Sequence, residues 1–217
     1  VLYAAGMAID LDGCANAYHP PTKAKPNSGR PPGLDDLRNA GSPGNWYGIV
    51  TTDGKKNGIP RVQGPSDPCP GFYVSPTALS DRTKKPTDPR AYVDAMTVPY
   101  VAIPGGRFGK TTGIRLGDLA VVLYRHESPF AAIIADIGPR VRIGEGSPAL
   151  ARALHLSERG HSPRDVVYVL LAGTRATPAW PGYNIHDDAL AAFSVWGGGD
   201  AEDGVNRVQG ILPGVIG

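Results

Sequence analysis

Glycine and proline interrupt this chain from end to end. There are 29 glycines and 22 prolines among 217 residues, which is about twice the usual share of these two residues. They are scattered and form no low-complexity run, so they divide the chain into short strands and small helices joined by long loops. This pattern argues against a helical bundle and favours an enzyme or binding protein whose site is built from loops.

Four apolar runs in the second half have the length and composition of β-strands: residues 98–103, 119–124, 130–137 and 165–171. Shorter strands are predicted at 46–51 and 72–74. Short helices are predicted at 33–40, at 77–83 behind Ser75-Pro76, at 149–156 behind Ser147-Pro148, and at 187–196. Since strands and helices do not alternate, we predict a mainly β, α+β fold built on a mixed β-barrel with long loops. We expect one domain over 1–217, with a Gly-rich extension from about residue 175.

Charge and hydropathy exclude two classes of partner. The net charge is +2 and the basic residues form no block, so we expect no nucleic-acid partner. No apolar run is long enough to span a membrane. The chain begins at Val1 without a signal-peptide core, as expected of a mature or trimmed product.

Two carboxylates are the strongest candidates for chemistry. Asp136 ends an apolar strand just before Gly138-Pro139, where a barrel opens to solvent. Glu145 lies between two glycines, which permit unusual backbone angles and close approach of a ligand, and it precedes a capped helix. The alternative is structural: Asp136 caps a turn, and Glu145 pairs with Arg140 or Arg142.

A second group of candidates lies in the first fifty residues. In an extended segment Asp10 and Asp12 share one face, although Asp12-Gly13 is also typical of an Asx turn. Tyr18 and His19 follow this segment. Trp46 and Tyr47 offer the aromatic surface on which sugars stack, although such residues in a strand more often belong to the core.

The chain has two cysteines, Cys14 and Cys69, each in a loop rich in glycine, proline and aspartate. In an exported protein they are candidates for one disulfide, and the alternative is a pair of thiols. No CxxC or Cys/His spacing is present, so we expect no metal.

Several segments resemble the fungal-type chitosanases of glycoside hydrolase family 75. The likeness lies in the strand that ends at Asp136, the Gly144–Ser147 step with the Ala/Leu-rich helix after it, and residues 160–168. Upstream, residues 9–13 resemble the Asp-rich segment near the start of the family's domain. The resemblance covers most of residues 1–172.

The resemblance implies an endo-acting hydrolase that cleaves β-1,4 bonds between glucosamine residues of chitosan by an inverting mechanism, without a cofactor. It implies a six-stranded barrel of the double-psi kind, with Asp136 and Glu145 as the essential carboxylates. We further expect a secreted monomer that binds its polysaccharide through an acidic groove. The predicted binding residues are Asp10, Asp12, Tyr18, His19, Trp46 and Tyr47. Alternatives are an enzyme that cleaves peptidoglycan or another amino-sugar polymer, and a carbohydrate-binding module without catalysis.

Overall fold

The computed structural model describes residues 1–21, 33–125, 128–176 and 184–215. It divides the chain into two compact units. The first combines Val1–Asp10 with Met96–Gly217, and the second is Leu11–Ala95. The expectation of one catalytic domain over 1–217 stays a prediction.

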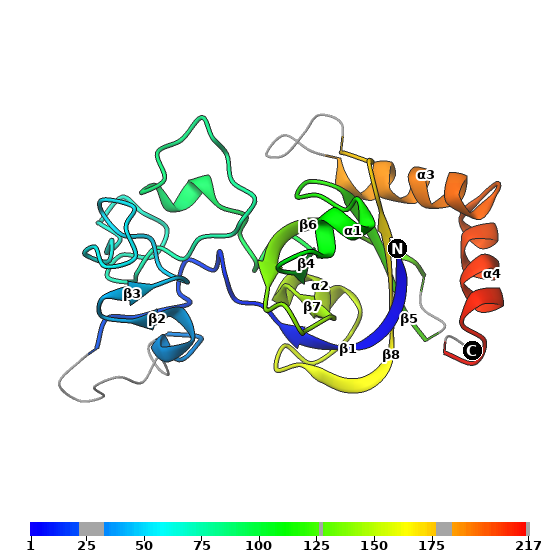
Figure 1. The fold of residues 1–217 in the computed structure, drawn as a ribbon, viewed down its shortest axis with the longest axis horizontal. Helices are drawn as coiled ribbons and strands as arrows, with labels where there is room; N and C mark the ends of the chain where they lie inside the picture. The colour runs from blue at the N-terminus through cyan, green and yellow to red at the C-terminus, as the bar shows by residue number, and fades with distance from the viewer. Residues whose placement is uncertain (22–32, 126–127, 177–183, 216–217) are drawn as a thin grey trace. The chain divides into compact units, whose positions relative to one another are not determined.

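The first unit is a closed barrel of six strands, drawn around the label α2 in Figure 1. Its neighbours run in the order β1-β7-β4-β6-β5-β8, and β8 pairs with β1 to close the ring. Parallel pairing joins β1 to β7 and β4 to β6, and the other pairs are antiparallel. The predicted mainly β fold with a mixed barrel is confirmed. The strands are β1 Leu2–Ile9, β4 Tyr100–Pro104, β5 Leu119–Tyr124, β6 Phe130–Gly138, β7 Glu145–Gly146 and β8 His161–Leu171.

Alternate residues of the strands fill the barrel. Val101 and Ile103 of β4 point inward with Ile134 of β6, whereas their neighbours face outward. The helix α2 (Pro148–Ala153) also contributes to this interior, and its Leu150 is fully buried.

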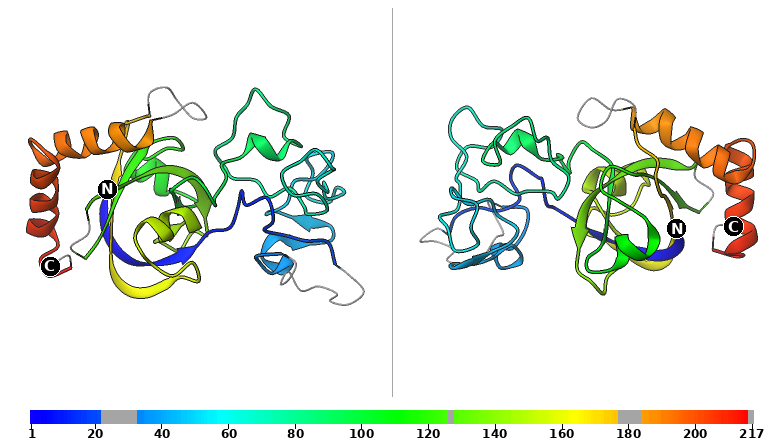
Figure 2. Two further views of the ribbon diagram at one scale, coloured as in Figure 1. Left: turned by 180° about the vertical axis from the view of Figure 1, so that it is seen from behind. Right: turned by 45° about the horizontal axis from the view of Figure 1, so that its top comes forward.

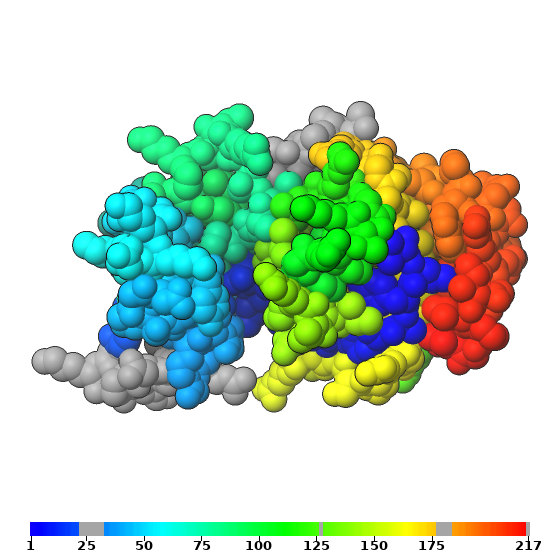
Figure 3. Space-filling view, viewed as in Figure 1, coloured from blue at the N-terminus to red at the C-terminus, as the bar shows by residue number. Residues whose placement is uncertain are grey.

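Two helices cover part of the outside of the barrel. The helix α3 (Ile185–Gly197) packs on β5 and β6, which explains why β5 is buried along both faces. The helix α4 (Ala201–Ile211) follows around a corner and packs on α3 (Figure 2). The predicted helix at 187–196 is thus confirmed, whereas α4 was missed. Elsewhere β1 stays partly accessible, and Figure 3 shows its dark-blue atoms at the surface.

The second unit has little regular structure. It holds the two-residue strands β2 (Gly41–Ser42) and β3 (Asn45–Trp46), and the 3-10 turns η1 (Leu37–Ala40) and η2 (Pro89–Ala91). The strand predicted at 46–51 is wrong: of these residues only Trp46 lies in a strand, and Thr51 forms an isolated bridge with Pro60. The helix predicted at 77–83 is wrong: Ser75 Oγ donates to Asp12 and accepts from Gly13 N, so it does not cap a helix.

The remaining helix, α1 (Phe108–Thr112), lies in the first unit. No helix in the described part of the chain is both long and apolar enough to cross a membrane.

Candidate active site

Asp136 leaves the barrel interior because of a β-bulge. Val101 of β4 pairs with Ile134, but the next residue, Ala102, pairs with Asp136, so Ala135 is an extra residue in β6. A strict alternation would place Asp136 on the same side as Ile134, inside the apolar core. The bulge turns the carboxylate to the opposite face of the sheet, which is a common use of bulges beside active sites.

Glu145 reaches the same face from the other side of β4. Ala102 pairs with Glu145 as well as with Asp136, so the two acids flank one alanine on neighbouring strands. Gly146, the next residue, faces the core, because a Cβ there would contact Leu150 and Met7. Side chains alternate along a strand, so Glu145 points away from the core, as Asp136 does. Both residues are 7% exposed.

The Glu145 carboxylate has two close neighbours. Arg142 Nη1 donates to Oε1 at 3.0 Å, and the Arg142 side chain itself is 58% exposed. The other oxygen, Oε2, occupies the space where a side chain at position 138 would begin. Gly138 thus leaves room for the carboxylate to reach across β4 toward the strand that carries Asp136.

The environment of Glu145 favours its protonated form. Burial raises the pKa of Glu145 and the nearby Asp136 charge adds to the increase, while the hydrogen bond and charge of Arg142 act against it. The apolar neighbour suggested by the sequence, Ile143, is 47% exposed, so it is not the main source of this burial.

Asp136 has a second carboxylate beside it. Asp10 follows β1, and its backbone N–H donates to Gly146 O at 2.9 Å. A carboxylate oxygen of Asp10 lies within 4.8 Å of one of Asp136. Asp136 Oδ1 also accepts from the N–H of Ile137 at 2.8 Å. The pairing considered for Glu145 is therefore present with Arg142, whereas Asp136 lies within β6 and accepts from the next residue of that strand instead of capping a turn.

Asp12 belongs to the second unit, where it lies in a hydrogen-bonded loop. Its Oδ1 accepts from Ser75 Oγ at 3.1 Å and from the Tyr18 hydroxyl at 3.3 Å. Tyr18 is buried, and its hydroxyl also lies 3.2 Å from Asp35 Oδ2. Tyr18 therefore positions the Asp12 loop rather than presenting its ring to solvent.

The aromatic candidates separate into buried and exposed groups. Trp46 is 6% exposed and its ring lies 6.3 Å from that of Tyr73. Tyr47, by contrast, is 58% exposed and donates to Arg38 O. His19 is half-buried, with its ring edge-on to Phe72 at 4.8 Å.

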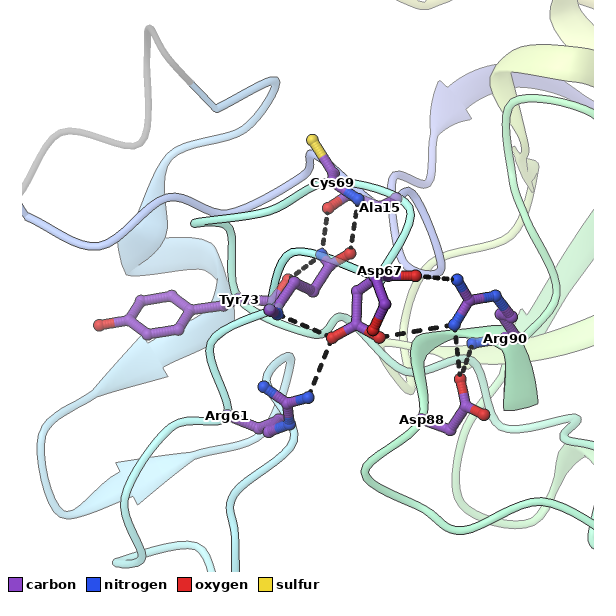
Figure 4. Close-up of polar contacts among 10 residues, drawn as sticks. Ala15, Arg61, Asp67, Cys69, Tyr73, Asp88 and Arg90 are labelled. Atoms are coloured by element: carbon purple, nitrogen blue, oxygen red, sulfur yellow. Dashed lines mark hydrogen bonds and ion pairs between the residues drawn. The ribbon is translucent and has the colours of Figure 1, made fainter.

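The disulfide considered for Cys14 and Cys69 is not formed in the structure, and both residues are thiols. The Gln63 side chain joins the two loops instead. Its Nε2 donates to Ala15 O at 2.6 Å, and its Oε1 accepts from Cys69 N at 2.9 Å. Figure 4 shows Ala15 and Cys69 next to each other, with dashed contacts running from both of them. Amide hydrogen bonds thus take the place of a covalent link, and burial raises the pKa of the Cys69 thiol.

An ion-pair network stabilises the same loops. Asp67 accepts from Arg61 at 2.9 Å and from Arg90 at 3.5 Å, and Arg90 also pairs with Asp88 (Figure 4).

Sequence reasoning missed the residues that shape the floor of the site. Ala102 and Gly138 leave space for the acids, and Ser147 fixes the strand that carries Glu145. Arg142 was considered only as a structural partner. One signal was available in the sequence. Gly138 follows the candidate acid Asp136 by two residues, and a glycine within a strand often marks a place where another group approaches the backbone closely.

Residues 52–203 match the protein family described as fungal chitosanase of glycosyl hydrolase group 75. The match includes Asp136 and Glu145, and it begins after Asp10 and Asp12, so it does not cover the upstream segment that resembled the family. Among curated proteins, none is significantly similar to this chain. Because the match spans well over half of the sequence, the chain belongs to the group 75 chitosanases, glycoside hydrolases that degrade the polysaccharide chitosan.

Proposed function

We propose that this chitosanase cleaves β-1,4 bonds between glucosamine residues within the chain of the polymer, with inversion at the anomeric carbon. Asp136 and Glu145 are the two catalytic carboxylates. The observation that supports this proposal best is their shared register, since Ala102 of β4 pairs with one acid on each side.

This register supports a separation suited to inversion. Neighbouring strands lie about 4.8 Å apart, so the Cα atoms of two residues on either side of β4 are roughly 9.6 Å apart. Inverting enzymes need carboxyl groups about 6.5–9.5 Å apart, because a water molecule must fit between one carboxylate and the sugar. Because the Glu145 carboxylate reaches across β4 as far as Gly138, the two carboxyl groups lie closer together than the Cα atoms do.

Glu145 is assigned as the general acid and Asp136 as the general base. Burial raises the pKa of Glu145, which is the direction that suits the group that must give a proton to the oxygen of the leaving sugar. Asp136 in its ionised form takes a proton from water as that water attacks the anomeric carbon. The glycosidic C–O bond breaks, and the product has the opposite anomeric configuration.

The test combines two variants with the stereochemistry of the product. We expect Asp136→Asn and Glu145→Gln each to lower kcat on chitosan by about 100-fold or more. Proton NMR of the first product released by the parent protein should show the α-anomer. Full activity in both variants would rule out the two-carboxylate mechanism, and a first product with retained configuration would rule out inversion.

Substrate binding is proposed for the other carboxylates and aromatic residues. Asp10, beside Asp136, is suited to pair with an ammonium group of glucosamine. In the second unit Asp12 has the same chemistry, and Tyr18 positions it. Trp46, Tyr47 and His19 are proposed as sugar contacts. Asp10→Asn should raise KM more than it lowers kcat, which separates a binding role from a catalytic one.

A second candidate substrate is peptidoglycan, an acidic amino-sugar polymer. The sequence pI of about 8.6 favours it. In addition, Arg142, Arg159 and Arg164 line a pocket of about 480 Å³ in the first unit. Release of reducing sugar from chitosan, chitin and peptidoglycan, measured side by side, decides between the substrates.

We also propose that the protein is secreted and acts as a monomer. Chitosan is a polymer too large to enter a cell, so its hydrolysis takes place outside. Activity in the culture medium of the source cells and the mass measured by light scattering test these two statements.

A further inference from the structure

The second unit contains a pocket that lies within this unit alone. Its volume is about 650 Å³, within the range of roughly 300–1,000 Å³ that is typical of small-molecule sites. Side chains of Trp46, Tyr73 and Ile59 line it, together with three prolines. Trp46 and Tyr73 are largely buried and form a firm wall, whereas Ile59 is 74% exposed at the rim.

The polar groups of the pocket are few and mostly neutral. Ser42 and Asn57 can donate and accept hydrogen bonds. The backbone carbonyl of Tyr73 accepts from Gln63 Nε2 at 3.1 Å, and in Figure 4 the Tyr73 ring extends away from the Asp67 network.

The charge of the pocket is unsuited to glucosamine. Arg38 is the only charged residue among those that line it in the described chain, and no carboxylate does so. The nearest acid that Arg38 contacts, Asp36, is already its bidentate partner. An ammonium group placed here would lose water, gain no counter-charge and meet a guanidinium group.

We propose that this pocket binds a neutral N-acetylglucosamine unit of partly acetylated chitosan. The acetyl methyl group and the C–H face of the ring would pack against the proline, tryptophan and isoleucine surface. The acetamide N–H and C=O would bond to neutral polar groups such as Asn57. The inference rests on the proposed function for the identity of the polymer, and it adds that the second unit selects acetylated residues.

The test uses the full chain carrying Glu145→Gln, so that the oligosaccharide is not cleaved. The isotope-labelled protein is titrated with the trimer of N-acetylglucosamine or the trimer of glucosamine, below neutral pH. The backbone amides of Gly44 and Gly58, which both line the pocket, report binding in NMR spectra. The acetylated trimer should shift them, with an affinity on the order of 10-fold or more above that of the charged trimer.

A charge introduced at the rim should reverse this preference. Ile59→Asp should weaken the binding of the acetylated trimer. It should also allow the glucosamine trimer to bind and to shift the amide signals of Gly44 and Gly58. Val195→Asp is the matched control, because Val195 is similarly exposed, at 81%, on α3 of the first unit. It should leave both titrations unchanged.

Two results would overturn the inference: equal or tighter binding of the glucosamine trimer at these amides, or no effect of Ile59→Asp. Cleavage of chitosan by the parent protein is measured separately. If that cleavage is absent but the acetylated trimer binds, the proposed function fails and the pocket assignment stands. If cleavage is present and neither trimer shifts the two amides, the pocket assignment fails and the proposed function stands.

Discussion

At the scale of single residues, the absence of a side chain at Gly138 shapes the site. Oε2 of Glu145 occupies the space that a Cβ would fill. Gly138 does not have a positive φ, so alanine fits its backbone. Gly138→Ala should therefore displace the flexible Glu145 carboxylate and leave the fold intact. We expect kcat to fall by about 10- to 100-fold, measured on chitosan, with only a small change in the melting temperature.

Gly210→Ala is the matched control, because nothing lies within 4 Å of a Cβ at that position. It should leave kcat unchanged. If Gly138→Ala retained full activity, the precise position of the Glu145 carboxylate would not matter for catalysis.

Arg142 allows a test of which acid donates the proton. Its charge opposes the burial that raises the pKa of Glu145, so Arg142→Gln should raise this pKa further. A general acid is active when protonated, and activity falls as the pH rises above its pKa. The alkaline limb of the kcat profile should therefore move to higher pH, and the movement should be modest because solvent screens so exposed a partner.

The exposed Arg82 forms no ion pair with a carboxylate within the described chain, and Arg82→Gln serves as the control. Movement of the acidic limb instead of the alkaline limb would assign Glu145 as the base and Asp136 as the acid.

The sequence singled out Asp136 and Glu145 as candidate acids of one cleft, but it did not predict the bulge that places them on one face. The amino-acid sequence alone shows that one acid ends an apolar strand and that the other lies between two glycines. The bulge at Ala135 depends on pairing with β4, which lies some thirty residues earlier. Regular alternation would have predicted Asp136 inside the core beside Ile134.

At the scale of elements, Ser147 ties three segments together. Its buried Oγ accepts from Tyr100 N at 3.0 Å and Leu150 N at 3.1 Å, and donates to Val98 O at 2.9 Å. Ser147→Ala would leave these groups without partners. We expect the free energy of unfolding in urea to fall by about 2–3 kcal/mol. Ser157→Ala, which removes one exposed contact to Arg159 N, should cost under about 0.5 kcal/mol. Equal effects would show that the Ser147 bonds contribute little.

The elements that could be predicted are those with strong apolar patterns. β5 lies at the predicted residues, and β4, β6 and β8 differ from prediction only at their ends. α4 was missed because its sequence, AEDGVNRVQGI, contains two internal glycines and few apolar residues. The helix expected after Ser75 failed because the capping serine binds the Asp12 loop instead. Local signals failed where a distant contact used the same side chain.

At the scale of the whole molecule, the abundance of glycine and proline has different outcomes in the two units. In the first unit these residues lie largely at the ends of apolar strands, so the barrel could be predicted. In the second unit apolar runs are short, and side-chain hydrogen bonds such as those of Gln63 with Ala15 and Asp67 with Arg90 hold the loops. Contacts of this kind join residues far apart in sequence, and no periodic pattern of apolar residues predicts them.

The net charge of +2 and the local carboxylates predict opposite effects of salt on the binding of chitosan. A weakly basic protein repels a cationic polymer, so screening of the whole molecule would lower KM. Binding through Asp10 and the acids beside it would instead weaken as salt screens the ion pairs, over a Debye length of about 10 Å at 0.1 M. We expect the local effect to dominate at contact distance. KM for chitosan should rise several-fold between about 0.05 and 0.5 M sodium chloride, with kcat little changed. The Asp10→Asn variant should show a smaller rise, and a KM that falls with salt would contradict recognition by local carboxylates.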